Sequence, residues 1–85
     1  DGLKHGVSEQ FYISGVSKFT MHYKNDLLEG LFILNYPDGV KEYEGNYLKD
    51  KKNGIWKYYK DDGSFDYEIE FLNGIQLTTF DEEER

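Results

Sequence analysis

The sequence predicts an all-β protein of up to seven antiparallel strands joined by hairpins. Three observations lead to this fold class. The chain repeats itself every 24 residues, hairpin-type dipeptides separate the repeated segments, and polar and apolar residues alternate within them. The composition agrees, because 18% of the residues are aromatic and aromatic side chains pack well on a pleated sheet.

Two columns of glycine mark the repeat. A glycine opens each of three frames, 6–29, 30–53 and 54–77, and a second glycine follows nine residues later. Neighbouring frames share six identical residues. The aromatic residues that recur at the same frame positions are Phe19, Tyr43 and Tyr67, and Tyr23, Tyr47 and Phe71. We therefore predict that residues 1–80 form an array of about three repeats, followed by an acidic tail at 81–85.

Turn signals bound the expected strands. Asp-Gly and Asn-Gly favour hairpins because type I′ turns need a positive φ at both central positions. Turns are expected at Asp1-Gly2, Ser14-Gly15, Asn25-Asp26, Asp38-Gly39, Lys49-Asp50, Asp62-Gly63 and Asn73-Gly74. The strands between them are expected at residues 3–13, 16–24, 27–36, 40–48, 52–60, 64–72 and 75–80.

The strands that return from each hairpin show the clearest alternation. In 16–24, 40–48 and 64–72 every second residue is apolar or aromatic, and the residues between them are polar. The outgoing strands 27–36 and 52–60 carry aromatic residues on one face. These aromatic residues are Phe32 and Tyr36, and Trp56 and Tyr58. No segment shows helical spacing over three turns.

The glycines that open the frames fall inside expected strands. Glycine weakens a strand, so Gly6, Gly30 and Gly54 indicate a bulge or the close approach of an aromatic side chain from the neighbouring strand. Thr78 takes this position after the third frame, which predicts that the array ends near residue 80. At the other end, residues 1–3 match the start of a hairpin, and we expect the chain to be the C-terminal end of a longer array.

Catalytic, cofactor and metal sites are not expected. The chain has no cysteine, and its two histidines, His5 and His22, occupy different repeat positions. No glycine-rich phosphate-binding motif occurs, and Asp61-Asp62 belongs to a turn signal rather than to a calcium loop. The sequence therefore predicts a protein that is not an enzyme.

Charge restricts the partners. The net charge of −7 would repel a phosphate backbone or an anionic bilayer, so neither nucleic acid nor membrane is expected. The lysines of Lys49-Asp50-Lys51-Lys52 are interpreted as a solvated turn. The compartment stays open, with the bacterial cytoplasm slightly favoured over a secreted or periplasmic location.

The pattern G-x-W-x-x-Y-x-x-x-G-x-x-x-Y-x-x-x-F-x-N-G at 54–74 resembles the bacterial variant of the MORN repeat. Residues 30–53 match with Phe32 in place of the tryptophan, and residues 6–29 match with Ser8 there. The resemblance implies a single-layer antiparallel meander of stacked β-hairpins, an elongated open sheet of about six to seven strands. A sheet of this kind offers no deep interior in which a pKa could be shifted. In bacteria such repeats occur in antitoxins of the YwqK type. In eukaryotes related repeats accompany catalytic domains, including some phosphatidylinositol phosphate kinases.

These observations predict a non-catalytic repeat module for protein–protein interaction. The candidate partner-binding residues are Phe32, Tyr36, Trp56 and Tyr58. Packing between strands is the other interpretation of these aromatic residues. The partner would be a protein, such as a toxin or the missing part of the chain's own array, and the open sheet edges could support oligomers.

Two alternative functions remain. One is an antitoxin or immunity protein that meets a basic partner through acidic residues 61–70. The other is an accessory MORN region of a protein named as a phosphatidylinositol-4-phosphate 5-kinase, or of a lipid-binding protein, with no kinase activity of its own.

Overall fold

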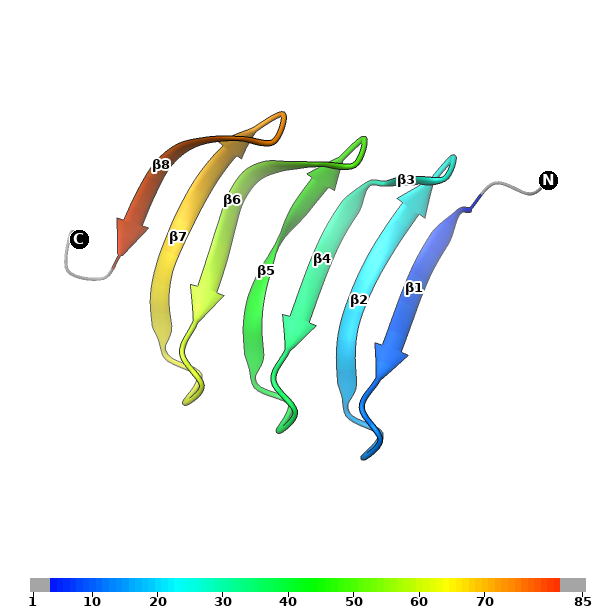
Figure 1. The fold of residues 1–85 in the computed structure, drawn as a ribbon, viewed down its shortest axis with the longest axis vertical. Helices are drawn as coiled ribbons and strands as arrows, with labels where there is room; N and C mark the ends of the chain where they lie inside the picture. Colours follow the sequence, from blue (N-terminus) through cyan, green and yellow to red (C-terminus); the bar gives the residue numbers. More distant parts are fainter. Residues whose placement is uncertain (1–3, 82–85) are drawn as a thin grey trace.

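The computed structural model describes residues 4–81 of the chain and the side chains of residues 4–77. This part of the chain is an open antiparallel sheet without a helix (Figure 1). The strands are β1 (Gly6–Phe11), β2 (Ser17–Lys24), β3 (Leu27–Leu28), β4 (Gly30–Asn35), β5 (Lys41–Leu48), β6 (Lys51–Tyr59), β7 (Phe65–Leu72) and β8 (Ile75–Asp81). The predicted all-β hairpin meander is therefore confirmed.

The sheet is a single layer. Its strands follow one another in the order β1-β2-β4-β5-β6-β7-β8, and the short β3 pairs with β2. Apart from β3, each strand lies beside the strand that comes before it in the chain, as Figure 1 shows. The molecule measures 48 × 35 × 11 Å, so its thickness is that of one sheet with its side chains. Within residues 4–81 no helix has the length and hydropathy of a membrane span.

Most strand boundaries lie within one residue of the expected ones, and three differences affect the predicted organisation. The expected strand 27–36 is divided at Glu29 into β3, which pairs only with β2, and β4, which begins at Gly30 with a φ of 110°. Strand β1 is shorter than the expected 3–13, and the turn expected at Asp1-Gly2 lies outside the described residues. Strand β8 extends to Asp81, one residue into the expected tail, and residues 82–85 lie outside the described part.

The hairpins use two kinds of turn, and this corrects the expectation of type I′ turns throughout. At one end of the sheet, both central residues have a positive φ, as in the type I′ turn. These residues are Asn25 and Asp26, Lys49 and Asp50, and Asn73 and Gly74. At the other end the loops have three residues, and only Gly15, Gly39 and Gly63 have a positive φ.

The aspartate of each Asp-Gly pair stabilises the turn through a hydrogen bond of its side chain. The Oδ1 atom of Asp38 accepts a hydrogen bond from the Val40 N–H at 3.0 Å. The Oδ1 atom of Asp62 accepts one from the Ser64 N–H at 2.9 Å. A hydrogen bond from an aspartate side chain to the backbone N–H two residues later is common in turns. The aspartate does not need a positive φ to form it.

Hydrogen bonds join each hairpin to the next at both ends of the sheet, and the same bonds recur from one repeat to the next. At the type I′ turns, the Oδ1 atoms of Asp26 and Asp50 accept hydrogen bonds from the N–H groups of Lys4 and Leu28, both at 2.6 Å. At the opposite end, the Tyr12 hydroxyl donates to the Asn35 carbonyl at 2.7 Å. The Tyr36 hydroxyl donates to the Tyr59 carbonyl at 3.0 Å. These bonds explain why turn residues and tyrosines recur in the sequence.

Of the two roles predicted for the frame-opening glycines, the structure shows the bulge at Gly54, where the register between β5 and β6 shifts. Gly6, Gly30 and Gly54 have φ values of 89°, 110° and 82°, a region that side chains rarely adopt. No aromatic side chain approaches them, however. The closest side chain at Gly30 is that of His22, and the space around Gly6 and Gly54 is open. The aromatic contact lies instead at Gly45, where a Cβ atom would overlap the indole of Trp56.

Candidate functional site

The register of the strands separates the side chains into two faces. Direct cross-strand partners share a face, and successive residues alternate between faces. Trp56 lies opposite Ile69, and Tyr58 lies between Tyr43 and Tyr67. We call this side the aromatic face. The residues of the aromatic face that contact one another through their rings are Phe19, Phe32, Tyr43, Tyr47, Trp56, Tyr58, Tyr67 and Phe71.

Trp56 is the centre of the aromatic face. Its indole is 0% exposed, and Phe32 beside it is 9% exposed, with their ring centroids 6.0 Å apart. The indole lies on Gly45, and its Nε1–H donates to the Asn46 carbonyl at 3.0 Å. The Nζ of Lys52 lies 4.8 Å from the indole centroid, a cation–π distance. Trp56 is thus fully buried in a one-layer sheet because its indole ring packs flat against Gly45, which has no side chain.

The four predicted site residues occupy three different environments. Phe32 and Trp56 form the core, and a side chain with no exposed area does not offer a contact surface. Tyr58 is partly exposed beside this core. Tyr36 lies apart from the ring cluster, because its hydroxyl is bonded to the Tyr59 carbonyl in the next repeat. We therefore regard Phe32 and Trp56 as the support of a surface, Tyr36 as a link between repeats, and Tyr58 as part of the surface itself.

Tyr58 belongs to a row of three tyrosines that cross-strand pairing brings together. The row consists of Tyr43, Tyr58 and Tyr67, which we call the tyrosine row. The Tyr43 and Tyr58 ring centroids are 5.2 Å apart, and those of Tyr58 and Tyr67 are 4.6 Å apart with nearly parallel planes. Sequence reasoning did not include Tyr43 and Tyr67 among the candidates. The sequence does show that Tyr43 and Tyr67 occupy the same position in successive repeats. Only the register of the strands shows that both lie opposite Tyr58.

The tyrosine row presents phenol groups at the surface of the aromatic face. All three side chains are partly exposed, and within the described part of the chain none of their hydroxyls has a hydrogen-bond partner. Burial raises the pKa of Tyr43 and of Tyr58, and for Tyr58 the neighbouring Tyr67 and Tyr43 add to the effect. Neutral phenols both donate and accept hydrogen bonds, so the row can bind peptide groups of a partner while its rings contact apolar atoms.

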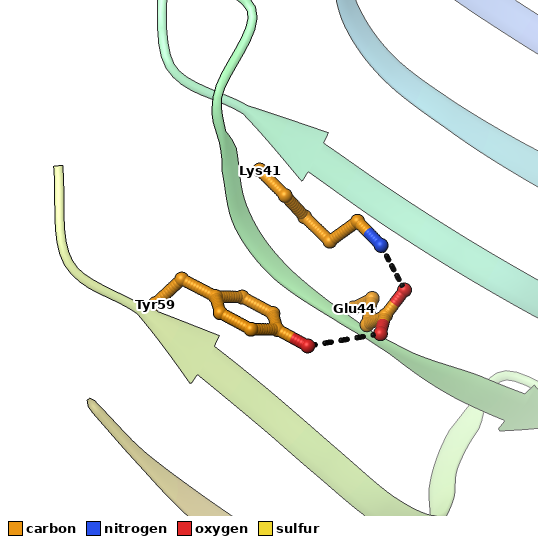
Figure 2. A network of polar contacts seen from close by, with 3 residues as sticks. All are labelled: Lys41, Glu44 and Tyr59. Carbon is orange, nitrogen blue, oxygen red and sulfur yellow. Dashed lines mark hydrogen bonds and ion pairs between the residues drawn. The ribbon is translucent and has the colours of Figure 1, made fainter. Parts of the chain in front are cut away.

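A polar network lies on the other side of the sheet, which we call the polar face (Figure 2). The Glu44 carboxylate accepts a hydrogen bond from the Lys41 ammonium at 2.8 Å and one from the Tyr59 hydroxyl at 3.2 Å (Figure 2). Lys57 lies opposite Glu44 on the next strand. The bond from Lys41 lowers the pKa of Glu44, and the Tyr59 hydrogen bond acts in the same direction, against a smaller effect of burial.

Glu44→Gln is expected to lower the free energy of unfolding near pH 7 by up to about 1 kcal/mol, since the pair is partly exposed. The folded pKa of Glu44 lies below its unfolded value. Its stabilisation is therefore complete above the unfolded pKa and is lost as the pH falls through the folded pKa. Urea unfolding of both proteins from about pH 7 to about pH 3 should show the difference shrinking. Glu29→Gln, outside the network, is the control. A difference that grows toward acid would contradict the assignment.

Among residues 4–77 no three His, Asp or Glu side chains converge as metal ligands would. The Nδ1 atom of His22 is 2.8 Å from the Leu31 carbonyl oxygen, and the Nδ1 atom of His5 accepts a bond from the Asn25 N–H at 3.4 Å. Both imidazoles thus contact backbone groups at the hairpin ends, and the candidate site is the tyrosine row.

Comparison with protein-family models, curated proteins and solved structures finds no match for this chain. The resemblance to the bacterial MORN repeat stays a prediction that depends on the repeat pattern. The function has to be argued from the surface itself.

Proposed function

We propose that the chain is a non-catalytic repeat module that binds another protein through the tyrosine row. The observation that carries this proposal is the stack of three partly exposed tyrosines whose hydroxyls have no partner among the described residues. Tyrosine is common at protein interfaces because it offers a large rigid contact area and a polar end at a small cost in conformational entropy.

The rest of the aromatic face supports this role. Trp56 and Phe32 are buried beside the row and fix the strands that carry it. The bonds from Tyr12 and Tyr36 hold successive hairpins in one register. A surface held this way loses little conformational entropy when a partner binds. The MORN-like repeat pattern agrees with an interaction module, although fold alone does not define function.

A basic toxin is a second candidate for the partner, which would make the chain an antitoxin or immunity protein. The acidic turn of the third repeat, Asp61 and Asp62, favours it. The hydrogen bond from the Ser64 hydroxyl lowers the pKa of Asp62, which keeps this carboxylate ionised. Binding to a toxin through this turn would weaken strongly with salt. Binding through the tyrosine row would weaken little.

The test compares the variants Tyr58→Ser and Tyr67→Ser with Lys57→Ser, a control on the polar face of the same strand. Crosslinked partners of the chain are first captured from cells of its source and purified, and their affinities are then measured by calorimetry. We expect each tyrosine variant, shown by circular dichroism to be folded, to bind at least about tenfold more weakly, and the control to bind unchanged. Equal affinity for all variants would overturn the assignment. A strong salt dependence abolished by Asp61→Asn would favour the toxin candidate.

A further inference from the structure

A hollow at one end of the sheet lies between two neighbouring turns. These turns join β5 to β6 and β7 to β8, and they lie at the same end of the sheet (Figure 1). The Gly74 N–H donates to the Lys52 carbonyl at 2.8 Å, which holds the two hairpins together there. The hollow has a volume of about 530 Å³, a usual size for a small-ligand site. Its lining residues are Leu48, Lys49, Lys51 and Asn73.

One lysine of the hollow has a backbone conformation that lysine rarely adopts. Lys49 has a φ of 49°, and outside glycine a positive φ is taken mostly by asparagine or aspartate. The other two repeats follow this rule, because Asn25 and Asn73 occupy the same position with φ values of 52° and 51°. The geometry of the turn therefore does not explain a lysine here. An unfavourable residue at such a position is typical of a functional site.

The other lysine of the hollow also departs from the repeat. Lys51 lies opposite Leu48 at the start of β6. The other two repeats have Leu27 and Ile75 at the same position. The aliphatic stem of Lys51 passes beside Gly74 of the next turn. An apolar residue thus satisfies the fold at this position, and the ammonium group of Lys51 is an addition that the fold does not require.

The charges of the two lysines are not neutralised by the rest of the described chain. Among residues 4–77 neither Lys49 nor Lys51 forms an ion pair. The acidic residue between them is Asp50, whose Oδ1 atom accepts the hydrogen bond from the Leu28 N–H in the preceding hairpin. Lys52 is directed to the aromatic face, where its ammonium lies over the indole. The hollow is therefore a local cationic site in a chain whose total charge is −7.

The surface beside the two ammonium groups is apolar. Leu48 is 41% exposed, and Leu72 and Ile75, which pair with each other in the next hairpin, are 54% and 67% exposed. Both leucines directly follow a residue of the aromatic face, so their side chains lie on the polar face. Lys51 belongs to the strand between them. The hollow thus combines two positive charges with exposed aliphatic side chains.

We propose that this hollow binds a single carboxylate joined to an apolar group, as in the C-terminal residue of a protein that ends in a large apolar side chain. The ammonium groups of Lys49 and Lys51 and the amide of Asn73 donate hydrogen bonds to the carboxylate. Leu48 contacts the apolar group. Capture of a terminal carboxylate is a known mode of peptide recognition. The hollow shares no residue with the tyrosine row, so this site is beyond the proposed function.

Charge favours a single carboxylate over a larger anion. The total charge of −7 repels a ligand with many negative charges, such as a nucleic acid or an anionic bilayer. One carboxylate that enters the hollow is instead complementary to the two lysines beside it. A peptide C-terminus carries this charge at its end, and its last side chain lies next to it. It therefore matches both the cationic and the apolar part of the hollow.

The experiment titrates the full chain, followed by NMR, with an N-acetylated tetrapeptide that ends in leucine and a free carboxylate. The matched control peptide ends in a carboxamide. We expect the free acid to shift the backbone amide signals of Lys49, Lys51 and Asn73, and to bind at least about tenfold more tightly than the amide, because hydrogen bonds to a charged group are the strong ones. Equal affinity of the two peptides would overturn the proposal.

Two variants carry residues that the other repeats already have at these positions. Lys49→Asn and Lys51→Ile should each bind the free acid at least about fivefold more weakly. Lys57→Gln removes the same charge elsewhere on the polar face and should bind as the wild type does. A loss of the same size with Lys57→Gln would mean that only the net charge is recognised, which would contradict the site.

Stability separates binding from a role of the lysine in the turn. The Tm of Lys49→Asn should be no lower than that of the wild type, since asparagine suits the positive φ. A lower Tm would mean that the lysine serves the turn itself, and the argument for a ligand would fail. Tyr58→Ser should bind the peptide unchanged, which distinguishes this site from the tyrosine row.

Two further probes test the kind of anion. Octanoate has a carboxylate and an apolar chain but no peptide group, and it should bind more weakly than the peptide acid. Tighter binding of octanoate would replace the protein C-terminus by a free carboxylic acid. Inorganic phosphate should also bind more weakly, because it has no apolar part. Phosphate that binds as tightly as the peptide would overturn the assignment to a carboxylate.

Discussion

Trp56→Ala is expected to lower the free energy of unfolding by about 3–5 kcal/mol, the range for deleting a buried tryptophan. The indole is the only fully buried large side chain among the described residues, and its ring contacts extend across β4 to β7. The chain as a whole has a stability of roughly 4–13 kcal/mol on a per-residue basis. The substitution therefore removes a large share of it, and urea unfolding followed by circular dichroism measures the loss.

Two companion variants show whether the loss comes from the ring. Trp56→Phe keeps an aromatic ring at the position that Phe32 fills one repeat earlier, and we expect it to lose less than half as much as the alanine variant. Lys57→Ala, an exposed neighbour on the same strand, should change stability by no more than about 0.5 kcal/mol. If Trp56→Ala cost no more than Lys57→Ala, the indole would not be the centre of the core.

Gly45→Ala is expected to destabilise the chain by about 1–3 kcal/mol through overpacking. The added methyl group would occupy the space of the indole ring, which rests on the glycine. On an ordinary strand the same change is favourable, because alanine loses less backbone entropy than glycine. The sign of the effect is therefore informative, and thermal and urea unfolding give it directly.

A double-mutant cycle isolates the cause. In the Trp56→Phe background the smaller ring leaves more room, so Gly45→Ala should cost clearly less than in the wild type. The interaction energy between the two positions is then the measure of their contact. Equal costs in both backgrounds would mean that Gly45 serves the backbone rather than the tryptophan.

Local patterns predicted most of the fold. Alternation with a period of two identified the strands from residue 16 onward, and the glycine and aspartate pairs identified every turn within the described residues. The type of turn was not accessible in the same way. Ser14-Gly15 and Asp38-Gly39 look like the central residues of two-residue turns. Each pair lies instead in a three-residue loop in which only the glycine has a positive φ, and the register of the hairpin shifts next to this loop.

The candidate site was predicted less well than the fold. Phe32, Tyr36, Trp56 and Tyr58 appear equivalent in the sequence, because all four are aromatic residues of outgoing strands. The structure divides them into a core pair, an inter-repeat link and one member of the tyrosine row. Burial depends on the neighbouring strands, and Gly45 provides the space that admits Trp56.

The sequence by itself determined the class of this protein: a repeated, all-β chain with one hairpin per 24 residues and two aromatic columns per repeat. These features are local, since turn chemistry and side-chain alternation act within a few residues. Only the tertiary structure decided which aromatic rings are buried and which tyrosines share a surface. Such relations join residues on different strands, and the register between the strands sets them.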